Sequence, residues 1–146
     1  MSEEDIEVVE VLFAAFAKRD DDAAARVLHP QIEIRPAIVG GPERAVYRGV
    51  DGSRQFWADI DAAWTEFRRE PREFRDLGGG EILVLGRAYA RARGGIALDE
   101  AVGWIASVRK GRIVRFRSFS NRLEALEAAR SRWAAGDSAQ EDRNPP

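Results

Sequence analysis

GRIVRFRSFSNRLEALEAA, residues 111–129, begins with the residue spacing of a β-strand and ends with that of a helix. In its first half, Arg115 and Arg117 flank Phe116, a period of two that is typical of a strand with one apolar face. In its second half the leucines stand three residues apart, as they do along one side of a helix. We therefore expect a strand that leads directly into a terminal helix.

The terminal helix has a recognisable start. Asn121, followed three residues later by Glu124, predicts an N-cap with a reciprocal side-chain contact. Leu123, Leu126 and Trp133 are expected to lie along the sheet.

The chain before this stretch, from Glu66 onward, consists of segments typical of strands joined by short glycine turns. The turns are GGG at 78–80, RGG at 93–95 and RKG at 109–111. Tight glycine turns are the shortest connection between consecutive antiparallel strands. The sequence therefore predicts an antiparallel meander of four strands.

The first half of the chain is predicted to hold three helices. The first ends at about Arg19 and carries Phe13 and Phe16 on its apolar face. A short second helix starts at the aspartates of 20–22, whose carboxylates suit a helix N-terminus, and ends before Pro30.

A strand at 31–36 and a brief strand around Tyr47 precede the third helix. One face of that helix is expected to carry Phe56, Ile60, Ala63, Trp64 and Phe67. Helices first and a long meander afterwards are typical of an α+β domain in which the helices pack on one face of a curved sheet.

Length and charge narrow the classes of function. We assign residues 1–135 to a single domain and 136–146 to a tail with too little apolar surface to fold. The net charge of -2 provides no field that would gather nucleic acid. No apolar run approaches the ~20 residues of a membrane span. The acidic start and the absence of Cys favour a cytoplasmic protein.

Motifs for metals and cofactors are missing. His29 is the only histidine and there is no cysteine, so no metal site is expected. No P-loop, G-x-G-x-x-G or G-x-S-x-G is present, and no cofactor is expected. His29 itself is expected at a helix end outside the site. The basic run at 109–117 fits the solvated or subunit-facing side of a hairpin better than a nucleic-acid patch.

Three segments occur together in a characteristic order: VLHPQIEIRP at 27–36, YRGVDGSRQFW at 47–57 and VRKGRIVRFRSFSNRLEALEAA at 108–129. From about Ile6 to Ala129 the chain resembles the SnoaL-like branch of the NTF2-like superfamily, which includes ketosteroid isomerase, polyketide cyclases and limonene-epoxide hydrolase. The resemblance implies an NTF2-like (cystatin-like) cone, with a small-molecule pocket between the concave sheet face and the three helices. It also implies a homodimer formed through the other sheet face, which would cover Ile113 and Phe119.

The resemblance to ketosteroid isomerase also implies which strand residues face the pocket, because a period of two fixes a whole face. The residues expected to point inward are Leu83, Leu85, Arg87, Tyr89, Arg91, Glu100, Val102, Trp104, Ala106, Val108, Val114, Phe116, Ser118 and Ser120.

The catalytic residues of the relatives do not carry over as sets. Arg35, Phe13 and Trp104 stand where the isomerase has its proton-shuttling Asp, its oxyanion-hole Tyr and its second donor, an Asp. Of the Arg-x-Asp pair and final-strand Asp of limonene-epoxide hydrolase, only the Arg is matched, by Arg87. The acid–base pair of the polyketide cyclases falls near Trp104 and Ser118. None of the three mechanisms can be copied.

Glu100, Arg87 and Tyr89 are the candidate catalytic residues. A carboxylate facing Arg87 is either a general base or half of an ion pair, and pairing would lower the pKa of Glu100 and make it a poor base. Arg87 could instead bind an anionic or carbonyl-bearing ligand. Tyr89 and Tyr47 are the hydroxyl donors.

The remaining candidates are ligand-binding residues of the pocket wall. They are Phe13, Phe16, Arg35, Tyr47, Trp57, Trp64, Trp104, Phe116 and Ser118. Trp64 fits the core as well as a ligand platform. Arg35 has an alternative place at the rim, pointing to water, with Ile34 inside if the strand register shifts by one.

Two functions follow from this pattern. One is a lyase, isomerase or hydrolase that acts on a small apolar molecule with a carbonyl or carboxylate group; the other is a non-catalytic small-molecule-binding homodimer. A third, a protein-assembly module, would need an exposed apolar patch.

Overall fold

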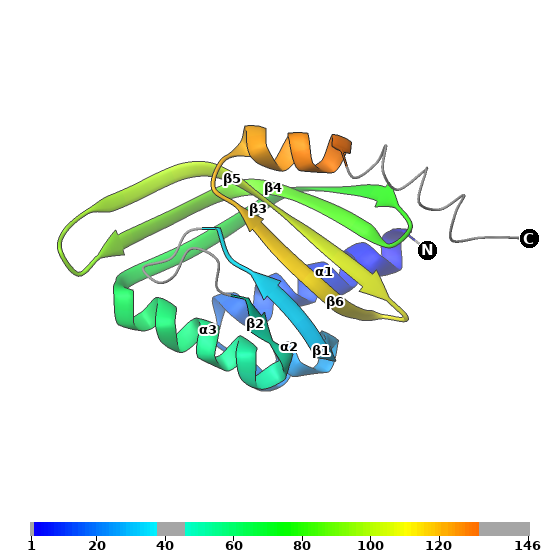
Figure 1. Ribbon diagram of the computed structural model, residues 1–146, viewed down its shortest axis with the longest axis horizontal. Helices are drawn as coiled ribbons and strands as arrows, with labels where there is room; N and C mark the ends of the chain where they lie inside the picture. Colours follow the sequence, from blue (N-terminus) through cyan, green and yellow to red (C-terminus); the bar gives the residue numbers. More distant parts are fainter. Residues whose placement is uncertain (1, 38–45, 132–146) are drawn as a thin grey trace, which may run out of the picture.

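The computed structural model describes residues 2–37 and 46–131, which fold into one curved sheet with helices on both faces (Figure 1). The elements in chain order are α1 (Ser2–Ala17), α2 (Asp21–Val27), β1 (Leu28–Arg35), β2 (Tyr47–Arg48), α3 (Gly49–Ala63), β3 (Trp64–Gly78), β4 (Glu81–Ala92), β5 (Ala97–Arg109) and β6 (Arg112–Phe119). A C-terminal helix begins at Arg122 and is described as far as residue 131. The tail expected at 136–146, and Trp133, lie outside the described residues.

The described strands form one six-stranded sheet in the order β2-β1-β6-β5-β4-β3. The meander β3 to β6 is antiparallel, as expected. β1 lies parallel to β6, with Ile34 opposite Phe116, so the sheet is mixed rather than purely antiparallel. Through this pairing, β1 and β2 extend the sheet beyond β6, the last strand of the meander. The arrangement confirms the predicted α+β cone.

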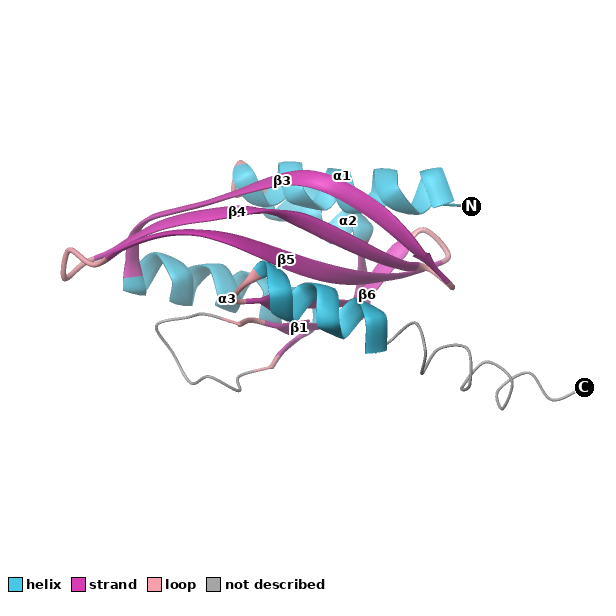
Figure 2. Ribbon diagram, turned by 90° about the horizontal axis from the view of Figure 1, so that it is seen from above, coloured by secondary structure: helices cyan, strands magenta, loops and turns pink. Residues whose placement is uncertain are grey.

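The two faces of the sheet carry separate hydrophobic cores. The inner face packs against α1, α2 and α3, with Leu12 and Ile60 among the fully buried residues. The outer face packs against Ala125 and Ala129 of the C-terminal helix. Figure 2 shows the sheet between α1 and the C-terminal helix. No helix of the described chain is long and apolar enough to cross a membrane.

The start of the C-terminal helix confirms the predicted cap. Asn121 Oδ1 accepts a hydrogen bond from the Glu124 backbone N–H at 2.8 Å, and the Asn121 amide donates to Glu124 Oε1 at 3.2 Å. Ala125 and Ala129 of this helix are buried against the sheet and Leu126 packs against the same core, as predicted, whereas Leu123 is 66% exposed. Small side chains let the helix lie close to the strands.

The facing of β4 differs from the sequence-based expectation. β4 and β5 pair continuously, without a bulge, so successive residues alternate between the faces. Ile82 and Val84 belong to the inner core, whereas Leu83 and Leu85 belong to the outer core. The prediction that the odd-numbered residues of β4 point inward is therefore wrong.

β6 contains a bulge that the alternation of its sequence does not reveal. Its pairing with β5 shifts between Arg115 and Ile113, which leaves Val114 as the extra residue. Phe116 and Ile113 both belong to the inner core, and Ile113 is 0% exposed. The expectation that Ile113 lies uncovered on the outer face is wrong, and Phe119 packs in the outer core.

The third helix is shorter than expected. It ends at Ala63, and Trp64 and Phe67 belong to β3 instead of the helix face. β3 itself has a register shift between Pro71 and Glu73. A bulge of this kind bends a strand and here accompanies the curvature of the sheet around the helices.

Gly86 permits the close approach of β3 to β4 beside this bulge. A Cβ atom at Gly86 would stand 2.0 Å from the carbonyl oxygen of Glu70, which is backbone and cannot rotate away. By contrast, a Cβ at Gly94, in the turn between β4 and β5, would meet nothing within 4 Å. The two glycines therefore form a matched pair for testing the packing of the edge strand.

We expect Gly86→Ala to destabilise the protein by roughly 1–3 kcal/mol, because the added methyl group must displace β3. Gly94→Ala is the control and should leave the free energy of unfolding within about 0.5 kcal/mol of the wild-type value. Urea denaturation followed by tryptophan fluorescence measures both variants, and equal stabilities would contradict the packing described here.

Candidate functional site

A cavity opens on the inner face of the sheet beside α3. It encloses, together with its open mouth, about 390 Å³. Its lining consists of Pro36, Ala37, Phe56, Phe67, Arg69, Ala88, Leu98, Val102, Trp104, Ser118 and Phe119. Apolar and aromatic side chains dominate, and Arg69 is the charged residue among them. Small-molecule sites commonly have this character, with a few polar groups in an apolar recess.

Arg69 reaches the cavity because of its place on β3. It stands opposite Ala88, which belongs to the inner core, so its side chain points to the same face. Phe67, two residues earlier, points the same way and also lines the cavity. The guanidinium group therefore extends under the helices from the edge strand of the sheet.

The guanidinium of Arg69 is enclosed by aromatic rings. Among the described residues, six ring centroids lie 5.1–5.8 Å from its central carbon, contributed by Trp57, Phe56, Phe67, Phe16, Phe116 and Trp104. Each distance is within the ~6 Å range of cation–π attraction. These rings come from α1, α3, β3, β5 and β6, so the cage requires the complete inner core. We call Arg69 and these six rings the aromatic cage.

The cation in the cage has no counter-ion within the described part of the chain. Arg69 Nη1 is buried without a hydrogen-bond partner, and no described side chain accepts a hydrogen bond from, or forms an ion pair with, the Arg69 guanidinium. The charge that acts on Arg69 is another cation, Arg19, whose guanidinium lies 3.8 Å over the Trp57 ring. A buried charge that is not paired is among the least favourable groups in a protein interior.

Burial, together with a smaller contribution from repulsion by Arg19, lowers the pKa of Arg69 to about 9. A group with this pKa is still protonated near neutral pH. The residue as a whole keeps some exposure, but its guanidinium end is buried. The cavity therefore presents a positive charge to whatever enters it.

Two other hydrogen-bond donors near the cage are unsatisfied. The indole Nε1 atoms of Trp57 and Trp64 are buried and have no partner among the described residues. The Trp57 ring belongs to the cage, and the Trp64 ring lies 6.3 Å from that of Phe67. The unsatisfied groups of this region are thus donors, and acceptors would complement them.

Several predicted ligand-binding residues lie on this inner face. Trp104 and Ser118 line the cavity, and Phe16, Trp57 and Phe116 belong to the cage. Phe13 packs edge-on against Trp104, with ring centroids 5.0 Å apart, one layer beneath the cavity. Their position was predicted from the sequence; their role toward a ligand stays a prediction.

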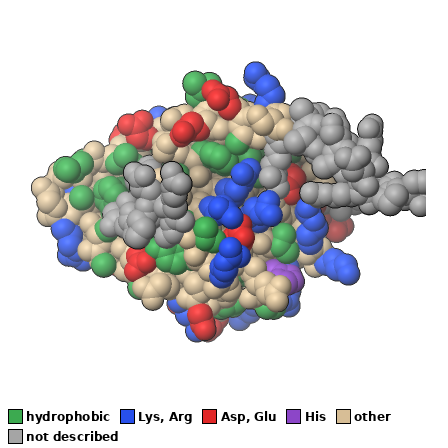
Figure 3. All heavy atoms as spheres, viewed as in Figure 1, with side chains coloured by type: hydrophobic (Ala, Val, Ile, Leu, Met, Phe, Trp, Pro, Cys, Tyr) green, Lys and Arg blue, Asp and Glu red, His purple; other side chains and the backbone are tan. Residues whose placement is uncertain are grey.

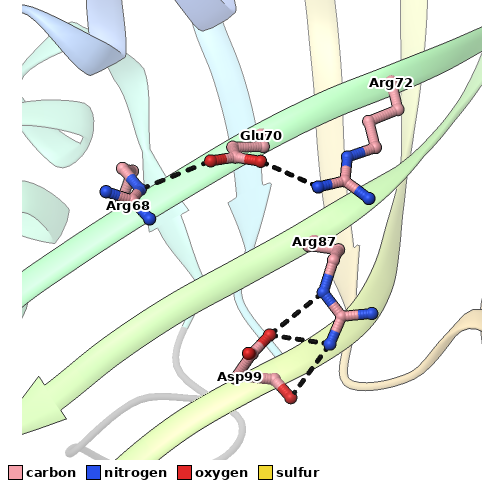
Figure 4. A network of polar contacts seen from close by, with 5 residues as sticks. All are labelled: Arg68, Glu70, Arg72, Arg87 and Asp99. Carbon is pink, nitrogen blue, oxygen red and sulfur yellow. Dashed lines mark hydrogen bonds and ion pairs between the residues drawn. The ribbon is translucent and has the colours of Figure 1, made fainter.

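The predicted pairing of Arg87 with Glu100 is wrong. Arg87 lies on the outer face, where its Nη2 and Nε atoms donate to Asp99 Oδ1 at 2.7 and 3.0 Å (Figure 4). Glu100 stands opposite Ala88 and shares the inner face of β5, but it is exposed. The strand phase explains the error, because a shift of one residue on β4 moves every side chain to the other face.

Tyr89 shares the outer face with Arg87, and its ring lies under the guanidinium of Arg68 at 4.5 Å. Glu70 lies between Arg68 and Arg72 along β3, at 3.6 and 3.0 Å from them. This group and the Arg87–Asp99 pair form an exposed polar network on the outer side of the sheet (Figure 4). Neither Arg87 nor Tyr89 can reach the cavity.

Arg35 takes the alternative position considered for it. Ile34 is buried in the inner core and Arg35 is exposed, donating to Glu33 Oε1 at 2.7 Å. Arg48 and Arg115 also pair with Glu33, and the hydrogen bond from Arg35 lowers the pKa of Glu33. Figure 3 shows this group of basic side chains around an acidic one over β1 and β6.

The hydroxyl of Tyr47 is already engaged. It donates to Asp59 Oδ2 at 2.6 Å, and Gln55 donates to the other oxygen of the same carboxylate. Burial, together with Asp59, raises the pKa of Tyr47 to about 12. Tyr47 packs against Phe56 behind the cavity lining and does not donate into the cavity.

Arg69 was missed in the sequence because it lies in a run of alternating charges, REPRE following Arg68, that is typical of a solvated surface. One local signal was available: Phe67 stands two residues before it, on the same face of a strand. Following that face from Phe67 would have placed one arginine of the run among aromatic residues.

Comparison with known families identifies the domain. The family model described as "SnoaL-like domain" matches residues 9–116. The chain belongs to the SnoaL-like family. No curated protein matches it.

Solved structures similar to this SnoaL-like domain share its fold. TerC, co-crystallised with polyporic acid, is 21% identical, with a TM-score of 0.71 over 87% of this chain and 98% of that one. An NTF2-like protein of unknown function from Burkholderia pseudomallei is 21% identical, with a TM-score of 0.71 over 85% and 95%. RV0760c from Mycobacterium tuberculosis, in complex with estradiol-17beta-hemisuccinate, is 16% identical, with a TM-score of 0.67 over 82% and 95%. These likenesses establish the NTF2-like fold.

We expect Arg69→Met to stabilise the ligand-free protein by about 1–3 kcal/mol. The substitution removes a buried, unpaired charge whose desolvation costs several kcal/mol, which we expect to exceed the cation–π attraction it gives up, about 2 kcal/mol or more for a desolvated cation. Arg68→Met is the matched control, since Arg68 is exposed on the opposite face and should change stability by less than about 1 kcal/mol. Urea denaturation measures both.

The stability difference between wild type and Arg69→Met should also depend on pH. The folded pKa of Arg69, about 9, lies well below the ordinary arginine value, so above pH 9 the unfolded chain holds a proton that the folded chain has released. The destabilisation is therefore complete below pH 9 and is relieved above it. The gap should stay constant below about pH 9 and narrow steadily as the pH rises above it; a constant gap would show that burial does not perturb Arg69.

Proposed function

We propose that the inner-face cavity binds a small, largely apolar organic molecule with a carbonyl or carboxylate group. The observation that carries this proposal is the lining of the cavity, in which apolar and aromatic side chains surround the charged group of Arg69. A wholly apolar recess would admit any hydrophobic molecule of suitable size. A cation within it favours molecules that also offer an acceptor.

The ligands of two similar structures support this class of molecule. TerC was crystallised with polyporic acid and RV0760c with estradiol-17beta-hemisuccinate. Both names denote organic acids. At 21% and 16% identity these relatives share the fold with this chain, so the ligand class is a proposal for this protein.

Catalysis is a second candidate, favoured by the position of Glu100. It lies on the inner face of β5 between Leu98 and Val102, both of which line the cavity. A carboxylate at the rim could take a proton from a bound carbonyl compound while Arg69 stabilises the resulting oxyanion. Turnover of a bound ligand that Glu100→Gln abolishes, with binding retained, would establish a lyase or isomerase; binding without turnover would establish a binding protein.

We expect Ala88→Leu to abolish ligand binding, because Ala88 lines the cavity and a larger side chain would fill it. A ligand at about 100 times its dissociation constant stabilises the wild-type protein by about 2.7 kcal/mol, which a thermal-shift assay detects. Ala101→Leu is the control, since Ala101 stands opposite Arg87 on the outer face and should leave the ligand-induced shift unchanged. A shift that survives Ala88→Leu would place the binding site elsewhere.

The homodimer and the cytoplasmic location are also proposals, and they rest on the family resemblance and on sequence composition. Ile113 and Phe119, the apolar residues that a dimer interface was first expected to cover, pack within the monomer. The outer face beside the C-terminal helix, around Tyr89 and Arg87, is the surface of the sheet left for a partner. Sedimentation equilibrium should give twice the 16.3 kDa mass of one chain; a single-chain mass at micromolar concentration would rule out the dimer.

A further inference from the structure

The aromatic cage specifies the charge of the ligand, which the proposed function leaves open. Arg69 is held with its guanidinium 5.1 Å from the Trp57 ring and 5.8 Å from the Trp104 ring, and Nη1 is buried without a partner. Aromatic faces stabilise the positive charge only partly, because cation–π attraction does not replace hydration or an ion pair. The electrostatic requirement of the cage is therefore unmet within the described chain.

We infer that the cavity is an anion receptor, in which a ligand monoanion (a carboxylate, or an enolate or phenolate oxygen) on an apolar body forms the missing ion pair with Arg69. This inference rests on the proposed function and narrows it to acids. The planar guanidinium, with parallel N–H groups, matches a carboxylate in two hydrogen bonds. The apolar body of the ligand would occupy the part of the cavity lined by Leu98 and Val102.

The nearby unsatisfied donor supports an anion over a neutral ligand. Trp57 Nε1 is buried without a partner, and its ring is part of the cage. A neutral amide would bring N–H donors as well as an acceptor, and among the lining side chains only the hydroxyl of Ser118 could accept from them. A carboxylate brings acceptors alone.

The charge count favours a monoanion over a dianion. Arg69 is the charged residue in the described lining, and the second nearby cation, Arg19, already pairs with Asp61 at 3.1 Å. One cation neutralises a carboxylate completely, whereas a phosphate dianion would keep an uncompensated charge in the apolar cavity.

The experiment compares matched acids and amides. Cinnamate and 1-naphthoate, their primary amides, and phenyl phosphate are titrated into the 146-residue chain by calorimetry and by tryptophan fluorescence, since Trp57 and Trp104 surround the binding group. We expect the wild-type protein to bind each acid at least about tenfold more tightly than its amide and more tightly than phenyl phosphate.

Variants test whether Arg69 is responsible for the preference for acids over amides. Arg69→Met should remove the preference for acids, Arg69→Lys should keep part of it, and Arg68→Met, on the outer face, should leave it unchanged. Because the expected ion pair is buried, the affinity should change little between about 0.05 and 0.5 M salt. Binding at the exposed arginines around Glu33 would instead weaken steeply with salt.

The outcomes separate the inference from the proposed function. Equal binding of acid and amide, or acid binding that persists in Arg69→Met, overturns the anion receptor and leaves a small-molecule cavity standing. Binding of neither acid nor amide contradicts both. If Arg69→Met fails to fold, the acid–amide comparison in the wild-type protein and in Arg69→Lys still tests whether the cavity is an anion receptor.

Discussion

Residues 82–86 of β4 and 102–108 of β5 are buried on both faces of the sheet, and the placement of the other elements follows from this. Ile82, Leu83, Val84 and Leu85 are each at most 1% exposed, although successive residues point to opposite sides of the sheet. One side requires α1 and α3 and the other requires the C-terminal helix. That helix can approach only because β5 has a glycine beneath it: a Cβ at Gly103 would stand 2.4 Å from the Cβ of Ala125.

Double burial also explains which parts of the structure could be predicted from the sequence. The elements were predictable because caps, turns and periods are local, as at Asn121, whose capping hydrogen bonds are formed. The phase of β4 was not, because ILVL at 82–85 is apolar at every position and gives no alternation to follow. On β6, the alternation of the sequence placed Phe116 correctly on the inner face. The bulge at Val114 reverses the predicted facing only for the residues before it, such as Ile113.

The sequence predicted the apolar walls of the candidate site but not Arg69, the charged residue among them. Phe16, Trp57 and Trp104 are large apolar residues, and their burial on the inner face follows from hydrophobicity alone. The polar candidates depended on strand phase, so Arg87 moved to the outer face with the rest of β4. The face of Arg69 could have been followed from Phe67 on the same strand, but its enclosure by rings from five elements is a property of the tertiary fold.

The aromatic cage buries Arg69 without neutralising it, so the positive charge stays available to a ligand. A carboxylate side chain in the cavity would neutralise the guanidinium and remove the reason for an acid to bind there, whereas aromatic rings provide attraction without a formal counter-charge. The rings also occupy the space in which water would otherwise hydrate the cation. The electrostatic penalty of burying Arg69 then falls on the ligand-free state, and an acid that enters the cavity relieves it. In the proposed anion receptor, binding and folding stability are therefore coupled through one side chain, because the residue that lowers the stability of the empty protein would also give the cavity its chemical selectivity.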